Sequence, residues 1–151
     1  MKEKASPTKS ALNSFKPLAA ELVLSEKTIF KEPRLLNKWV VWLEQRPHES
    51  GRTTVLIRPW GCSEFQGQEL TPAPIDVRTR VHSYGGGALA TLDHDDQLLF
   101  AWIDDSDGCL WTQTWTALVN PNKDEGLWVE AIHLPIRISK KADYALADGL
   151  I

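Results

Sequence analysis

The sequence predicts an all-β protein made of short antiparallel strands. Apolar residues occur in short runs rich in Val, Ile, Leu and Trp, and turn-forming residues such as Pro, Gly and Asp bound most of these runs. The runs cover residues 37–45, 53–58, 69–72, 88–92, 97–103, 109–115 and 127–135. Helical spacing is confined to residues 10–26, where Pro17 interrupts it.

The strands fall into two sets that repeat at a spacing of about 40 to 50 residues, which is typical of the four-stranded blades of a β-propeller. We expect a short helical or irregular arm at 1–20, partly disordered, a first blade at 21–76, a second blade at 77–135, and the start of a truncated third blade at 136–151. About two blades would leave open edges and a half-covered core, so we predict a partial β-propeller. A finished sandwich of eight strands is the alternative.

Acidic residues cluster in two turns, DHDD at 93–96 and DDSDG at 104–108. Calcium loops also bring carboxylates together, but a loop ending at Gly108 would need acids where Ile103 and Thr114 stand. Hairpin turns explain both segments, because Asp and Gly adopt turn conformations readily. The four histidines do not have the spacing of a zinc site, so we expect no metal and no cofactor.

The composition is that of an ordinary domain with no general attraction for nucleic acid. The 151 residues are 42% hydrophobic and 25% charged, with a net charge of −3, whereas binding to phosphates calls for a basic surplus. The basic start of the chain is not followed by an apolar run of signal-peptide length. Only two cysteines occur, Cys62 and Cys109. We expect a cytoplasmic protein with two reduced thiols and with no nucleic-acid or membrane partner.

The segment VRTRVHSYGGG at 77–87 has an unusual pattern. Its alternation predicts an extended strand over 77–82, because alternate side chains of a strand point to the same face. One face would carry Arg78, Arg80, His82 and, in the same parity, Tyr84. The opposite face, which suits packing against a core, would carry Val77, Thr79 and Val81. At Gly85, Gly86 and Gly87 the backbone can turn or approach another segment closely, because no Cβ is present.

The positive face needs a negative partner, because neighbouring like charges repel each other. Either Asp76 or another acidic residue pairs with the arginines and fixes the loop, or the face binds a carboxylate or carbonyl groups of a peptide. The candidate substrate-binding residues are therefore Arg78, Arg80, His82 and Tyr84. The candidate structural turn consists of Gly85, Gly86 and Gly87.

Seven tryptophans are many for a chain of this length. Exposed together, they could stack on sugars and form a binding module, whereas inside strands they fill the space between packed sheets. Their positions within the predicted strands favour packing. Trp60, between Pro59 and Gly61, is the best candidate for exposure.

Three segments carry a family resemblance: VVWLEQRPHESGRTTVLIR at 40–58, ELTPAPIDVRTRVHSYGGGALA at 69–90 and ADYALADG at 142–149. In this order they resemble the N-terminal end of the propeller domain in serine peptidases of the prolyl oligopeptidase family, in the branch with acylaminoacyl and dipeptidyl peptidases. The similarity spans roughly residues 20–149. Ser83 stands where the family commonly has Glu, and residues 103–130 diverge.

The resemblance implies a multi-bladed propeller that caps an α/β-hydrolase domain carrying Ser, Asp and His, and that admits peptides to the catalytic site. The sequence shows no counterpart of that second domain, and Gly61-Cys62-Ser63 only partly matches its nucleophile motif. We therefore expect no catalytic residue here, and a fragment that gates or binds peptides for a hydrolase domain absent from this chain. A free-standing β-rich interaction module and an inactive remnant are the alternatives. Open blade edges would also permit self-association.

Overall fold

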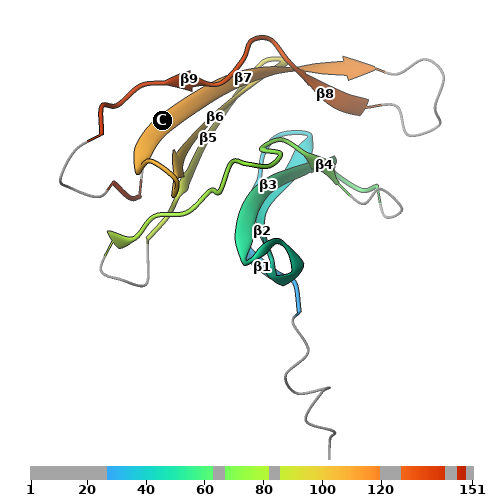
Figure 1. Ribbon diagram of the computed structural model, residues 1–151. Helices are drawn as coiled ribbons and strands as arrows, with labels where there is room; N and C mark the ends of the chain where they lie inside the picture. Colours follow the sequence, from blue (N-terminus) through green and yellow to red (C-terminus); the bar gives the residue numbers. More distant parts are fainter. Residues whose placement is uncertain (1–26, 63–66, 82–85, 120–126, 142–145, 149–151) are drawn as a thin grey trace, which may run out of the picture.

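The computed structural model describes residues 27–62, 67–81, 86–119, 127–141 and 146–148, which form two antiparallel β-sheets (Figure 1). These residues contain strands and short 3-10 turns, and no α-helix. The all-β class is therefore confirmed, and sheets of four and five strands are consistent with partial propeller blades. Within the described ranges, no helix has the length and apolarity needed to cross a membrane.

The first sheet contains, in spatial order, β1 (Ile29–Leu35), β2 (Trp39–Arg46), β3 (Arg52–Pro59) and β4 (Gln68–Glu69). β2 and β3 pair over their full lengths. The 3-10 turn η2 (Pro47–Glu49) joins them, and Ser50 and Gly51 then close the hairpin with φ angles of 58° and 78°. Glycine suits the second of these positions because it adopts positive φ without a steric penalty.

The second sheet contains, in spatial order, β5 (Leu89–His94), β6 (Gln97–Asp104), β7 (Cys109–Val119) and β8 (Leu127–Ala131), and β9 (Ile136–Arg137) also pairs with β7. The two acidic segments lie at the β5–β6 and β6–β7 connections, so the prediction that they form hairpin turns is confirmed. Residues 136 and 137, which we expected to begin a third blade, belong to the second sheet.

Strand β1 was not predicted from the sequence, and its geometry explains why. Its register against β2 shifts between Lys31 and Arg34. Within this shift Glu32 has a φ of 46°, and Pro33 follows. A bulge that contains proline interrupts the alternation by which strands are recognised. The predicted N-terminal arm at 1–20 lies outside the described residues.

The core lies between the facing surfaces of the two sheets, which Figure 1 shows as separate layers. On β2 the alternation sends every second side chain inward, so that Trp39, Val41 and Leu43 are buried. The second sheet contributes Phe100 and Trp102, which are 2% and 1% exposed. Each large apolar side chain buried in this way stabilises the fold by about 1.5–3 kcal/mol.

The tryptophans serve mainly as core residues, as predicted. Trp39, Trp102 and Trp115 are buried, and Trp111 packs against the core from a partly buried position. Trp60 is 66% exposed, which confirms the prediction for that residue. Trp128 on β8 is 45% exposed, although its position in a strand had indicated packing.

Candidate functional site

Residues 76–78 run between the two sheets and hydrogen-bond to both. The Val77 N–H donates to the Thr53 carbonyl in β3 at 2.8 Å, and the Arg78 N–H donates to the Ile103 carbonyl in β6 at 3.0 Å. Apart from a single β-bridge between Val77 and Asp104, residues 77–80 are irregular. Of the strand predicted over 77–82, the described residues 77–81 form none, because the backbone divides its hydrogen bonds between two sheets and continues the ladder of neither.

The alternation of burial is nevertheless present in this segment. Val77 and Thr79 are 1% and 5% exposed, whereas Arg78 is half-buried and Arg80 is exposed. The predicted division into an inner and an outer side thus holds for these four residues. His82, Tyr84 and Gly85 lie outside the described residues.

Two aspartates are the acidic partners of the arginines. Arg80 donates from Nε and Nη2 to the two carboxylate oxygens of Asp105, at 2.5 and 2.6 Å. Arg78 donates from Nη2 to Asp76, and the same nitrogen lies 3.9 Å from Asp105 Oδ2. The hydrogen bonds from Arg80 lower the pKa of Asp105 although burial opposes this, and they raise the pKa of Arg80. The carboxylates of Asp76 and Asp105 therefore compensate the positive charges of Arg78 and Arg80.

A cavity of about 610 Å³ lies beside the arginines. The buried side chains in its lining are those of Leu43, Thr53, Val77, Thr79 and Ala88. The charged side chains in its lining are those of Lys31, Glu32, Arg78 and Arg80. This volume lies within the range that small-molecule sites occupy, and its lining combines buried apolar side chains with a larger share of polar and charged groups.

The bulge in β1 forms one side of the cavity. Glu32 accepts a hydrogen bond from the Ala88 N–H through Oε1 and another from Arg34 Nη2 through Oε2, both at 3.2 Å. Arg34 also donates to the Leu89 carbonyl at 2.5 Å. The unusual φ of Glu32 thus coincides with contacts that tie β1 to the start of β5.

The described glycines of the triple-glycine segment lie against residues 146–148. The Gly87 N–H donates to Asp148 Oδ1 at 2.7 Å, and the Asp148 N–H donates to the Gly87 carbonyl at 2.8 Å. A Cβ at Gly87 would stand 2.8 Å from Asp148 Oδ1, and one at Gly86 would stand 2.9 Å from the Cβ of Ala147. The contact at Gly86 requires glycine, because the Cβ of Ala147 is fixed to its backbone, whereas a Cβ at Gly87 would displace the Asp148 carboxylate.

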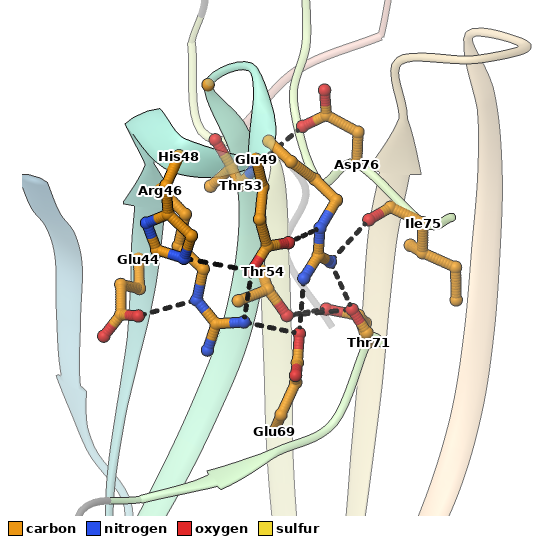
Figure 2. Close-up of polar contacts among 12 residues, drawn as sticks. Glu44, Arg46, His48, Glu49, Thr53, Thr54, Glu69, Thr71, Ile75 and Asp76 are labelled. Atoms are coloured by element: carbon orange, nitrogen blue, oxygen red, sulfur yellow. Dashed lines mark hydrogen bonds and ion pairs between the residues drawn. The ribbon is translucent and has the colours of Figure 1, made fainter. Parts of the chain in front are cut away.

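A cluster of arginines and glutamates supports the chain that leads from β4 to the cavity (Figure 2). Arg52 is buried and donates from Nε to Glu49 at 2.5 Å and from Nη2 to Glu69 at 2.7 Å. Its Nη1 donates to the carbonyls of Thr71 and Ile75 at 2.9 and 3.0 Å. The Arg52 side chain therefore holds two glutamates and two backbone carbonyls in place.

Arg46 completes this arginine–glutamate cluster. It donates to Glu44 at 2.7 Å, to Glu49 at 3.1 Å and to Glu69 at 3.2 Å. The hydrogen bond from Arg52 lowers the pKa of Glu49. Burial tends to raise the pKa of Glu69, but the contacts with Arg52 and Arg46 lower that pKa by more. Both glutamates are ionised at neutral pH, which suits a structural role better than that of a general acid.

Lys31, Glu32 and the arginine–glutamate cluster were not assigned to a site from the sequence. The acidic segment at 104–108, which includes Asp105, predicted a hairpin turn but not the pairing of Asp105 with the arginines. Cys62 and Cys109 are not joined in a disulfide. Within the described residues, no group of three or more His, Cys, Asp or Glu side chains could hold a metal ion.

The two-sheet fold is similar to part of a puromycin hydrolase and to part of a puromycin-hydrolysing peptidase. The crystal structure of a puromycin hydrolase has a TM-score of 0.52 and 24% identity, over 78% of this chain and 17% of the hydrolase. A puromycin-hydrolysing peptidase of Mycobacterium tuberculosis has a TM-score of 0.50 and 22% identity, over 69% of this chain and 21% of the peptidase. No family model and no curated protein matches the sequence. The likeness therefore concerns the fold, and the chain spans about a fifth of the length of these two proteins.

Proposed function

We propose that this chain is the N-terminal propeller region of a cytoplasmic serine peptidase of the prolyl oligopeptidase family, present here as a fragment. In this role it gates or binds peptides for an α/β-hydrolase domain. The fold shared with two puromycin-hydrolysing enzymes carries the proposal. The matched part is only 17% and 21% of those chains, and for this reason we propose a region of a larger enzyme. The ligand-sized cavity lined by Arg78 and Arg80 supports a role in peptide binding.

The test is reconstitution. The purified chain is expected not to cleave peptide p-nitroanilides or esters, because it carries no nucleophile, base and oxyanion hole in a recognisable motif. Mixing it with the α/β-hydrolase region encoded next to it should give cleavage of short peptides. Turnover by the chain alone that survives Ser63→Ala would contradict the proposal, as would neighbouring sequence without a hydrolase region.

A free-standing interaction module is the second candidate, and one observation favours it. Large apolar side chains at alternate positions after β8 are well exposed, namely Ile132, Leu134, Ile136 and Ile138. Exposed apolar surface of this kind marks contact sites between proteins. Reconstitution separates the two candidates, because a free-standing interaction module should not give peptide cleavage when it is mixed with a hydrolase region.

A further inference from the structure

The cavity beside Arg78 and Arg80 has an unequal supply of hydrogen-bond donors and acceptors. Glu32 in its lining accepts from the Ala88 N–H and from Arg34. Asp105 lies outside the lining and accepts twice from Arg80. Asp76, which pairs with Arg78, also accepts from the Thr53 N–H at 2.9 Å. Every one of these six carboxylate oxygens thus has a protein donor.

The cationic groups in the lining are only partly occupied. Within the described part of the chain, the Nη1 groups of Arg78 and Arg80 have no acceptor, and Lys31 forms no ion pair. The Nε of Arg78 is buried and has no partner either. Guanidinium and ammonium groups only donate, so a ligand that satisfies them must present acceptor oxygens.

The ligand must also be small and in part apolar. The cavity holds about 610 Å³, and Leu43, Val77 and Ala88 give part of its lining an apolar character. Gln45 and Thr53 add neutral polar groups from β2 and β3. An acceptor-rich group on a short chain with amide bonds fits this combination better than a bare inorganic anion, which has no apolar part.

We infer that this cavity binds the free C-terminal carboxylate of a short peptide, with Lys31 as the residue that pairs with the carboxylate. The inference rests on the proposed peptide-binding function and specifies which end of the peptide is recognised. The arginines fix the shape of the site through Asp76 and Asp105 and offer their Nη1 groups to carbonyl oxygens. Lys31 is exposed on a bulged strand, so it can reach a ligand at little cost to the fold.

The experiment compares two ligands that differ only at the C-terminus. N-acetyl-trialanine with a free carboxylate and the same peptide as the C-terminal amide are titrated into the chain at low salt, with binding followed by calorimetry. We expect the acid to bind about threefold to fivefold more tightly than the amide, because solvent weakens an ion pair with an exposed lysine even at low salt. Lys31→Gln should abolish this difference without changing the affinity for the amide.

Lys140→Gln is the matched control, because it removes the same charge at an exposed position outside the cavity, and it should leave the preference for the acid intact. Thermal melting of all three proteins checks that each is folded. Equal affinity for the acid and the amide would overturn the inference while leaving peptide binding standing. Binding of neither peptide would overturn both. Inorganic phosphate that binds as tightly as the acid would also overturn the inference, since the site would then recognise any anion.

Discussion

Replacing Arg52 by Met should lower the free energy of unfolding by about 3 kcal/mol. The Arg52 side chain is only 10% exposed, so water cannot replace its hydrogen bonds. The carbonyls of Thr71 and Ile75 would each lose a donor, at about 1 kcal/mol apiece, and the loss of the bond to Glu69 would cost about 1.5–3 kcal/mol. Burial of the Met side chain offsets part of this total.

Urea unfolding followed by tryptophan fluorescence measures the effect, because a change in midpoint at constant slope reports stability alone. Arg58→Met is the matched control: this guanidinium lies 5.9 Å from the ring centroid of Trp42 and is partly exposed. Its removal should cost only about 0.5–1 kcal/mol. A loss below about 1 kcal/mol for Arg52→Met would refute the conclusion that this arginine holds the chain between β4 and the cavity.

Three further outcomes follow from the same contacts. Stability should fall as the pH drops below about 4.3, because Arg52 holds the folded-state pKa of Glu49 and Glu69 below the unfolded value. The stabilisation is fully present above the unfolded pKa. It is lost as the pH falls through the folded pKa values. Urea midpoints at several pH values would show this, and a loss equally large in Arg52→Met would contradict it. Gly86→Ala should destabilise the fold by about 1–3 kcal/mol, because the new Cβ would stand 2.9 Å from the Cβ of Ala147, and Ala147→Gly should restore part of the loss in thermal melts. Self-association that rises with concentration in sedimentation should weaken in Leu134→Glu, since that side chain is 84% exposed; a wild-type monomer at all concentrations would argue against it.

The sequence predicted those strands that pair with a neighbour along most of their length. β2, β3 and β6 lie within two residues of the predicted runs, because their inward side chains keep a period of two or are continuously apolar. β1 was missed because its bulge and proline break the period. Local pattern reveals a strand only where the strand is regular.

For the candidate site, the sequence indicated the two arginines but not what surrounds them. Alternation separated Arg78 and Arg80 from the buried Val77 and Thr79, and this is a local property. The Asp105 partner comes from a hairpin 25 residues further along the chain from Arg80, and Lys31 comes from the strand that was missed. Contacts between residues so far apart in the chain depend on how the two sheets pack. The periodicity of the sequence does not show this packing.

The paired amide bonds of residues 77 and 78 bear on how the protein unfolds. One amide is held by β3 and the next by β6, so neither sheet can open without exposing an amide of the connecting chain. The two ladders should therefore melt as one cooperative unit, and both amides should exchange with solvent only through global unfolding. In a larger assembly, strain applied to one sheet would then be transmitted to the other through the peptide bond between Val77 and Arg78.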